Sequence, residues 1–579
     1  MKQRSGYEVW RRYLSPHLRE LAGLMVLVLV GTGLQLINPQ IVRLFINSTS
    51  EKRSISALIV IALVYIVVAI AAQGTSLAAT YLGEKVAWKS TNALRTDLAA
   101  HALRLDMTFH HQQTPGVMIE RIDGDVSVLA NFFSHFGVKV VSNFLLLLGM
   151  LALLFQINWM MGAAFTVFTV IAMLVLKRMR NYAVPRWGDT RQSSASLFGF
   201  LEERLAGTED VRSNGATQYV MRRLFELSRT KLWTDKKAYF ASGVTWNTTI
   251  LIFAIGTGMA WSFGAYLFWK GSISLGTAFL IYMYVNMLRT PVEQIAQQFQ
   301  DLQKAQACIQ RTQQFLSIDS KLVDGPGKEL PKSALAVEFD NVRFGYKEDE
   351  IVLKGINFCL ESGQKLGLLG RTGSGKSTIA QLLFRFYDVQ QGSVRLGGVD
   401  AKLATIEQWR SRLAIVTQEV QLFSGTIRDN LTFFNPAISD AKILDAFERL
   451  GLLEWLNSLE NGLDTQLGAG GEGLSAGQGQ LLAFARIYLR DPGLVIFDEA
   501  SSRLDPATER LLSQAVERLL ENRTGIIIAH RLQTIQRVDH VMILDQGKII
   551  EYGKREELKR SDTSRYAQLL RHGMEALLA

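Results

Sequence analysis

The residues with the clearest chemistry lie in the glycine-rich stretch GRTGSGKST, which runs from Gly370 to Thr378. Its spacing fits G-x-x-x-x-G-K-[ST], and it lies between an apolar run and an amphipathic run, which predicts a strand, a tight loop and a helix. Glycines let backbone N–H groups close around phosphate oxygens, and the helix N-terminus adds a partial positive charge. We expect Lys376 to reach the β- and γ-phosphates of a nucleotide and the Ser377 hydroxyl to ligate Mg²⁺. A glycine turn that merely joins a strand to a helix is the alternative.

Further amide, acid and base side chains follow apolar runs in the second half of the chain. Gln418 follows LAIVT, Asp498 and Glu499 follow LVIF, and His530 follows GIIIA. Such side chains at strand ends, beside a phosphate loop, are typical of an α/β nucleotide site. Phosphoryl transfer needs positioning, a metal ion and a group that orients water. A carboxylate next to Asp498 can accept a proton from that water.

The glycine-rich segment GGEGLSAGQGQ, from Gly470 to Gln480, lies between these motifs. It offers the Ser475 hydroxyl and the Gly477 backbone N–H at the start of a helix that we expect from Gln478 to Leu489. A helix N-terminus of this kind suits an anion.

Composition excludes several classes of protein. The chain has 579 residues, which is too long for one ordinary domain, and a formal net charge of +10. Much of the basic excess flanks uncharged runs, which favours membrane topology over nucleic-acid binding, and no basic stripe with interleaved aromatic residues is present. Two cysteines far apart in sequence exclude a disulfide framework and argue against a structural zinc site.

The first half contains long uncharged runs that predict six membrane-spanning helices. A mixed basic and aromatic start, without a cleavable signal peptide, is expected to form an interfacial amphipathic helix. Asn158 and Trp159 are expected to split one overlong run into a tight hairpin of two spans. Buried helices of a soluble protein are the alternative. The expected spans are Leu21 to Val42, Ser54 to Gly83, the two halves of Val140 to Leu176, Ala238 to Trp269, and Gly271 to Leu288.

Basic residues before the first span and between spans four and five predict a cytoplasmic N-terminus and long cytoplasmic helical extensions after spans two and four. The connections near Glu51, Asn158 and Lys270 are then short and face outward. The spans carry amides and almost no ionisable groups, which argues against ion coupling and favours an amphipathic or neutral cargo, although amides also pack between helices. Gly and Pro residues among charges mark 317–333 as a linker.

Taken together, the motifs and their order resemble those of ATP-binding cassette (ABC) transporters of the exporter type, over nearly the whole chain. The resemblance implies a half-transporter that binds ATP and Mg²⁺ and works as a dimer in the bilayer. The implied fold is a membrane α-helical domain of the domain-swapped exporter type (1–316), followed after the linker by an α/β P-loop ATPase domain (334–579). A multi-pass protein of a bacterial plasma membrane is expected, with the N-terminus and the ATPase domain cytoplasmic.

The resemblance also assigns roles to single residues. It gives Glu499 as the general base, His530 as the γ-phosphate switch and Gln418 as the sensor of Mg²⁺ and the attacking water. Mg²⁺ is assigned to Ser377, Gln418 and Asp498. Tyr346 would stack on adenine, and Asp505 would lie in the inter-subunit loop. The signature segment, Leu474–Gln478, would contact the partner's nucleotide. The expected nucleotide-binding residues are Tyr346, Gly370, Arg371, Thr372, Gly373, Ser374, Gly375, Lys376, Ser377, Thr378, Gln418, Ser475, Gly477, Gln478, Asp498, Asp505 and His530.

Two segments of the membrane half, 110–126 and 201–216, resemble the cytoplasmic coupling loops of this family. The signature segment departs from the family pattern: it reads LSAGQ, followed by Gly479, Gln480 and Leu481, where the common form is LSGGQ followed by Arg-Gln-Arg. Off-pattern signatures often occur in one chain of an asymmetric pair, so a heterodimer is slightly favoured over a homodimer.

We therefore expect an ATP-driven half-transporter that exports or flips a drug, lipid or peptide. Two alternatives remain open. One is an ATP-binding, mostly non-hydrolysing half of a heterodimer, and the other is an importer of metal chelates on the same fold.

Overall fold

The computed structural model describes residues 11–135, 139–347, 349–417, 420–498, 506–529 and 532–572. The chain divides into two compact units. The first contains the residues up to Leu103 together with Pro115–Ile318, and the second contains Arg104–Thr114 together with the residues from Asp319 onward. A short piece of the membrane half, Arg104–Thr114, is thus part of the second unit by its contacts. The predicted boundaries at 316 and 334 stay predictions.

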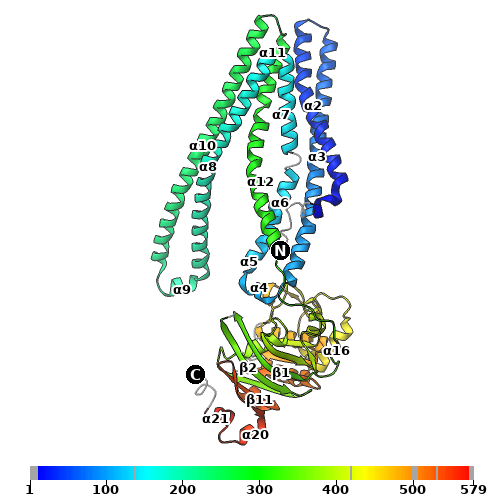
Figure 1. Ribbon diagram of the computed structural model, residues 1–579, viewed down its shortest axis with the longest axis vertical. Helices are drawn as coiled ribbons and strands as arrows, with labels where there is room; N and C mark the ends of the chain where they lie inside the picture. Colours follow the sequence, from blue (N-terminus) through cyan, green and yellow to red (C-terminus); the bar gives the residue numbers. More distant parts are fainter. Residues whose placement is uncertain are drawn as a thin grey trace. The chain divides into compact units, whose positions relative to one another are not determined.

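The first unit is built from helices (Figure 1). The helices are α2 (Leu18–Ser50), α3 (Ile55–Arg104), α5 (Pro115–Ile119), α6 (Asp125–His135), α7 (Val141–Ile157), α8 (Trp159–Ala206), α9 (Thr208–Ser213), α10 (Thr217–Trp269), α11 (Leu275–Met287) and α12 (Arg289–Leu316). Among these described helices α2, α3, α8, α10 and α12 have 28 to 53 residues and are far longer than the mean helix of about 11–12 residues in soluble proteins.

Among the described residues, four helices are long and apolar enough to cross a membrane, namely Arg11–Ser50, Ile55–Arg104, Trp159–Ala206 and Thr217–Trp269. They contain expected spans one, two, four and five. The other two expected spans correspond to α7 and α11, which have 17 and 13 residues. The predicted hairpin is confirmed: α7 ends at Ile157, and the Asn158 side chain caps α8 by accepting a hydrogen bond of 3.2 Å from the Met161 N–H.

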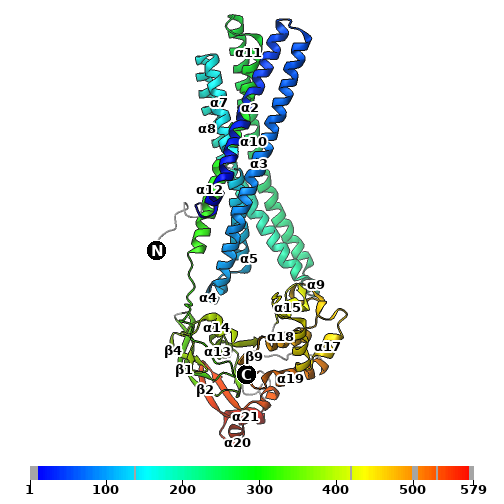
Figure 2. The same cartoon turned by 90° about the vertical axis from the view of Figure 1, so that its right-hand side faces the viewer.

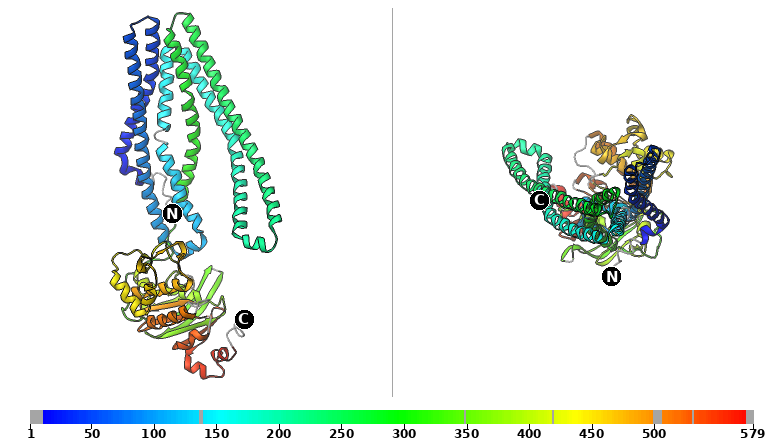
Figure 3. Two further views of the ribbon diagram at one scale, coloured as in Figure 1. Left: turned by 180° about the vertical axis from the view of Figure 1, so that it is seen from behind. Right: turned by 90° about the horizontal axis from the view of Figure 1, so that it is seen from above.

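Spans and cytoplasmic extensions are continuous helices rather than separate elements. α8 and α10 run side by side and are joined at one end by the short helix α9, as the views in Figures 1 and 3 agree. Polar pairs link the two helices, including Ser193 with Thr234 at 2.7 Å and Trp187 Nε1 donating to Ser242 Oγ at 2.9 Å. The helical extension expected after span four is the end of α8.

The second unit contains a six-stranded sheet, a four-stranded sheet and a two-stranded ribbon. The six-stranded sheet has the order β12-β11-β3-β10-β9-β6, and it is parallel except for the edge strand β12. The four-stranded sheet has the antiparallel order β2-β1-β4-β5, and the ribbon is β7-β8. The strands are β1 (Val337–Lys347), β2 (Glu350–Leu360), β3 (Lys365–Gly370), β4 (Gln391–Leu396), β5 (Val399–Asp400), β6 (Leu413–Val416), β7 (Gly425–Thr426), β8 (Gln466–Leu467), β9 (Leu494–Asp498), β10 (Thr524–Ile528), β11 (His540–Asp545) and β12 (Lys548–Lys554).

The parallel sheet separates two hydrophobic cores, because successive side chains of a strand point to opposite faces. Leu494 and Ile496 enter the core shared with the four-stranded sheet, whereas Val495 and Phe497 enter the core shared with helices. Figure 2 shows these helices around β9. The helices of the second unit are α4 (Met107–Gln112), α13 (Lys376–Leu383), α14 (Ile406–Ser411), α15 (Ile427–Thr432), α16 (Asp440–Leu450), α17 (Leu453–Asn457), α18 (Ala476–Arg490), α19 (Pro506–Leu520), α20 (Arg555–Arg560) and α21 (Arg565–His572).

Two element boundaries differ from the sequence predictions. The apolar runs 336–339 and 352–360 predict two strands with Tyr346 between them, but Tyr346 lies inside β1, because β1 and β2 pair through bulges as far as Lys347 and Glu350. The helix α18 begins at Ala476, two residues earlier than expected, because Ser475 and Gln478 form a capping box at its N-terminus.

Candidate functional site

The phosphate loop follows β3 and leads into α13, as predicted. Gly370 has φ +154°, and a Cβ there would lie 2.3 Å from the Leu544 carbonyl oxygen and 2.6 Å from Ser374 Oγ. Gly375, the N-cap of α13, has φ +107°, and a Cβ there would lie 2.6 Å from Leu353 Cδ2. Only glycine fits both positions, so the loop backbone can stay close and present its N–H groups.

Lys376 is buried within this loop. Its Nζ donates hydrogen bonds to the carbonyl oxygens of Gly370 at 2.7 Å and Arg371 at 2.9 Å. The Ser374 hydroxyl is also buried and, within the described part of the chain, has no hydrogen-bond partner. A buried ammonium, an unpaired buried hydroxyl and loop N–H groups together fit a phosphate group.

Oxygen groups suited to Mg²⁺ occur at the same place in the fold. Ser377, in the first turn of α13, is exposed, and Asp498 ends β9. Asp498 pairs in register with Ile528 of β10, which in turn pairs with Leu368 of β3. The Asp498 carboxylate and the phosphate loop therefore lie at the same carboxyl edge of the parallel sheet, where nucleotides bind in such folds. Hydroxyl and carboxylate oxygens are ligands that Mg²⁺ accepts.

Tyr346 lies against the helix that follows the phosphate loop. Its hydroxyl donates to Gln381 Oε1 at 2.6 Å and contacts Thr378 Oγ1 at 3.1 Å. The ring packs edge-on against Tyr387, with centroids 5.3 Å apart. Burial raises the pKa of Tyr346. Its hydroxyl therefore stays protonated, and the ring is fixed beside Thr378.

The signature segment forms the N-terminus of α18, where Gly477 is buried. Ser475 Oγ accepts from the Gln478 N–H at 3.2 Å, and Gln478 Oε1 accepts from the Ser475 N–H at 2.9 Å. This exchange satisfies two of the N-terminal N–H groups and leaves those of Ala476 and Gly477 in the first turn. Ser475 and Ala476 are exposed, so the N-terminus is open to an anion from outside.

Several predicted site residues, namely Gln418, Glu499, Asp505 and His530, lie outside the described residues. Of the others, the loop from Gly370 to Thr378 and Asp498 lie at the carboxyl ends of β3 and β9, and Tyr346 lies against α13. Gly477 and Gln478 belong to α18, and Ser475 is its N-cap. Sequence reasoning missed Gln381, which orients Tyr346. It also missed Asp106, whose position before a helical turn is a recognisable N-cap signal.

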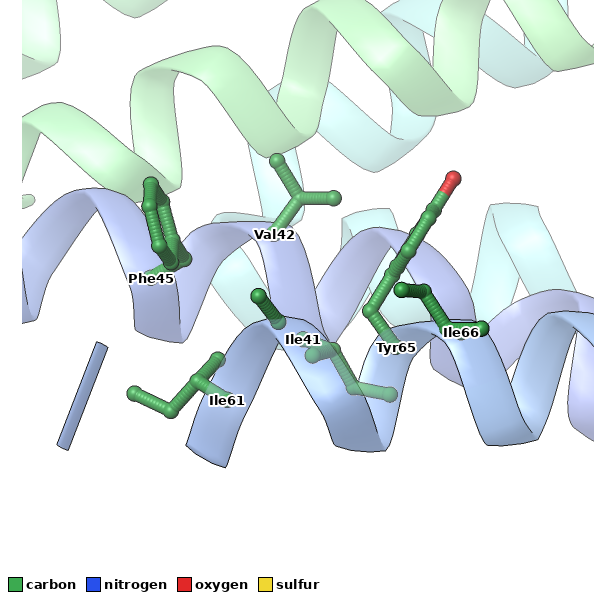
Figure 4. A pocket seen from close by; sticks show the side chains of 7 residues that line it. Ile41, Val42, Phe45, Ile61, Tyr65 and Ile66 are labelled. Carbon is green, nitrogen blue, oxygen red and sulfur yellow. The ribbon is translucent and has the colours of Figure 1, made fainter. Parts of the chain in front are cut away.

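An apolar pocket of about 300 Å³ lies between α2 and α3 in the first unit (Figure 4). Its lining is aliphatic and aromatic, and the Tyr65 hydroxyl points away from the other labelled side chains. The lining residues are Ile41, Val42, Phe45, Ile61, Ala62, Tyr65 and Ile66. Such a surface suits hydrocarbon groups.

Comparisons with known proteins cover both units. The family model of the ABC transporter transmembrane region matches residues 21–292, and the ABC transporter model matches residues 353–502. A solved structure described as a bacterial Atm1-family ABC exporter with ATP bound has a TM-score of 0.79 and 24% identity, and covers 96% of this chain and 98% of that one. At this identity the likeness concerns the fold.

Curated relatives match over most of the chain. An uncharacterized ABC transporter ATP-binding protein YknV of Bacillus subtilis (strain 168) is 30% identical over 95% of this chain and 92% of its own length. A multidrug efflux ATP-binding/permease protein of Mycobacterium bovis (strain BCG / Pasteur 1173P2) is 31% identical over 96% of this chain but 46% of its own length. An ATP-dependent lipid A-core flippase of Desulfotalea psychrophila (strain LSv54 / DSM 12343) is 30% identical over 82% of this chain and 83% of its own length.

The family models and the relatives lead to the same assignment, which agrees with the phosphate loop and the apolar helices. The protein is a multi-pass membrane protein that binds ATP and hydrolyses it to drive transport. The chain belongs to the ABC transporter family, as a half-transporter in which a helical membrane domain precedes the ATPase domain.

Proposed function

We propose that this chain is one half of a dimeric exporter or flippase that moves an amphipathic or hydrophobic molecule, such as a drug, lipid or peptide, out of the cytoplasmic side of the membrane. The main observation that supports the use of ATP is the position of Lys376, which is buried in a glycine loop at the carboxyl edge of the parallel sheet. The cargo class is supported by the names of the relatives, by the apolar pocket, and by spans with almost no interior charge.

The nucleotide is held by residues of one chain at this sheet edge. Lys376 binds the β- and γ-phosphates, with loop N–H groups around them, and the Tyr346 ring stacks on adenine. Ser377, Asp498 and Gln418 hold Mg²⁺, which neutralises phosphate charge. Glu499 accepts a proton from the attacking water, and His530 donates a hydrogen bond to the γ-phosphate or holds Glu499 in place.

The second chain completes each site. Ser475, Gly477 and Gln478 lie at a helix N-terminus at which Ser475 is exposed, which supports a role toward the nucleotide of a partner, with Asp505 in the loop between subunits. The relative that is about twice as long as the matched region also supports two halves per transporter. Closure of the two ATPase domains around ATP would turn the membrane cavity outward, and hydrolysis would reset it.

A heterodimer is slightly favoured because the signature departs from the common pattern at Ala476, Gly479 and Leu481. In the strongest form of this alternative, the chain binds ATP, hydrolyses little by itself and supplies its signature to a partner. Import of metal chelates on the same fold is the remaining alternative.

The test is ATPase activity and particle mass of the full chain in lipid nanodiscs. An active dimer supports a self-sufficient exporter, and a nearly inactive monomer supports a missing partner chain. In an active dimer, Glu499→Gln should trap ATP and stop turnover. Hydrolysis at the wild-type rate by the symmetric Glu499→Gln dimer would contradict the assigned base.

A further inference from the structure

We propose that Asp106 is a positioning residue that fastens the linker after the last membrane helix to the first cytoplasmic loop, so that both segments follow the ATPase domain together. The inference rests on the proposed function, because it names a part of the path by which ATP use reaches the membrane helices.

The Asp106 carboxylate is buried, with 8% of the residue exposed, and it uses its two oxygens toward different segments. Oδ1 accepts a hydrogen bond of 3.2 Å from the Phe109 N–H and caps α4. Oδ2 accepts a hydrogen bond of 2.7 Å from the Lys321 N–H and lies 3.5 Å from Ser320 Oγ. One side chain therefore joins two segments more than 200 residues apart in the chain.

The ends of this bridge lead directly to membrane helices. α3 ends at Arg104, two residues before Asp106, and α12 ends at Leu316, five residues before Lys321. Within the first unit the same two helices are also linked, since His101 Nε2 lies 3.0 Å from the Phe315 carbonyl oxygen. A displacement of Asp106 and Lys321 would therefore move the ends of α3 and α12 together.

The linker beyond Lys321 is attached to the ATPase core rather than free. The Val323 carbonyl oxygen accepts a hydrogen bond of 2.7 Å from the buried Arg385 guanidinium. Asp324 Oδ1 accepts a hydrogen bond of 2.7 Å from the Ile406 N–H. Further on, Arg412 donates to the carbonyl oxygens of Pro331, Lys332 and Ser333. The bridge therefore connects α4 to a segment that moves as part of the second unit.

The nucleotide side of the domain is close to the same bridge. Burial, the neighbouring Tyr346 and the Asp106 charge all raise the pKa of Tyr387. Tyr387 in turn packs edge-on against Tyr346, the residue proposed to stack on adenine. Asp106 is thus within electrostatic reach of the aromatic pair at the adenine site.

The carboxylate itself is charged at neutral pH. Burial alone would raise the pKa of Asp106, but the hydrogen bonds from Lys321, Phe109 and Thr108 outweigh burial, and the pKa lies below its ordinary value of 3.8. Charge-assisted bonds of this kind are stronger than neutral ones.

Variants of Asp106 and of Lys321 distinguish the hydrogen bond between these two residues from the capping of α4 by Asp106. Asp106→Ser keeps a good N-cap for α4 but is too short to reach Lys321 as well, and Asp106→Asn keeps one acceptor oxygen but replaces the other with an N–H donor that cannot accept a second hydrogen bond. Lys321→Pro removes the donating N–H, and Lys321→Ala keeps it and serves as the matched control. Because Lys321→Pro breaks the bond from the opposite side, the test does not depend on the folding of Asp106→Ser alone.

The measurement uses the full chain in nanodiscs, with Cys359→Ser to remove the exposed thiol and spin labels at Glu51→Cys and Lys270→Cys, in the short connections expected to face outward. Labelled chain is diluted with unlabelled chain, and the distance between labels is compared with and without ATP, Mg²⁺ and vanadate. We expect Asp106→Ser and Lys321→Pro to lose at least half of the ATP-dependent change while ATP hydrolysis stays within about twofold of the wild-type rate. Asp106→Asn should lose the change as these two variants do, because its amide has one acceptor oxygen, whereas Lys321→Ala should behave like the wild type.

A full-sized distance change in Asp106→Ser and in Lys321→Pro would overturn the role of Asp106 and leave the proposed function intact. No ATP-dependent change in a labelled dimer that hydrolyses ATP, with Asp106 and Lys321 unaltered, would contradict the proposed function, and this inference with it.

Discussion

The Lys376 ammonium lies 2.7 Å from the carbonyl oxygen of Gly370, at the opposite end of its own loop. The side chain thereby spans the phosphate loop and holds it closed from inside. Since a Cβ at Gly370 would meet the Leu544 carbonyl oxygen at 2.3 Å, the loop is also fixed from the sheet side. The loop is therefore shaped before any phosphate enters, which reduces the entropy that binding must overcome.

Lys376→Ala should lower the turnover of ATP by about 100-fold or more, because it removes a preorganised positive charge from the phosphates. Phosphate release by the chain in nanodiscs measures this effect, together with ATP affinity. Lys354→Ala, which changes an exposed lysine on the neighbouring strand β2, is the matched control and should be silent. Unchanged turnover in Lys376→Ala would show that the loop is not the catalytic nucleotide site.

Two replacements of Tyr346 should distinguish the contribution of its ring to ATP binding from that of its hydroxyl. Tyr346→Ala is expected to weaken ATP binding by about tenfold, since a lost aromatic contact costs on the order of 1–1.5 kcal/mol. Tyr346→Phe loses only the bonds to Thr378 and Gln381 and should bind ATP nearly as well as the wild type. Titration with a fluorescent ATP analogue tests both. Equal weakening in the two variants would assign the role to the hydroxyl instead of the ring.

Ser475→Ala should reduce both stability and activity, because Ser475 caps α18 and is proposed to meet the partner's nucleotide. Loss of an N-cap bond costs about 1 kcal/mol, which thermal unfolding can detect. Ser439 occupies the same N-cap position in α16 but makes no capping hydrogen bond with its side chain. Ser439→Ala is therefore the control, and it should change neither property. Normal ATPase activity in Ser475→Ala would argue against its contact with nucleotide.

The ion pair between Asp125 of α6 and Arg311 of α12 should respond unequally to loss of either partner. The Asp125 side chain is 3% exposed and that of Arg311 52%, with Arg311 Nε donating at 2.9 Å to Asp125 Oδ2. Arg311→Ala leaves a buried carboxylate without its ion-pair partner. It should lower the free energy of unfolding by about 2–3 kcal/mol, which is less than for fully buried pairs. Asp125→Ala leaves an arginine that can reach water, and about 1 kcal/mol is expected. Melting temperatures in detergent compare the two variants. A lower melting temperature for Asp125→Ala than for Arg311→Ala would refute this account.

Local signals in the sequence predicted much of this architecture. The strand, loop and helix around Lys376 and the hairpin at Asn158 follow from spacing, glycine and capping, which act over a few residues. The position of Tyr346 in β1 depends on bulged pairing with β2, and a bulge leaves little trace in composition. The Asp106 bridge joins residues more than 200 positions apart, so no local pattern could indicate its partner.

The lengths of α8 and α10 have a mechanical consequence. At 1.5 Å per residue, the 48 residues of α8 extend about 70 Å, of which the hydrocarbon core of a bilayer takes about 30 Å. The remainder is an arm of about 40 Å that contains Pro185, ends at α9 and packs along α10. A tilt of about 5° within the bilayer then displaces α9 by about 3–4 Å, close to the diameter of a water molecule. This hairpin therefore converts a small rotation among lipid-embedded helices into a displacement large enough to make or break hydrogen bonds at its tip.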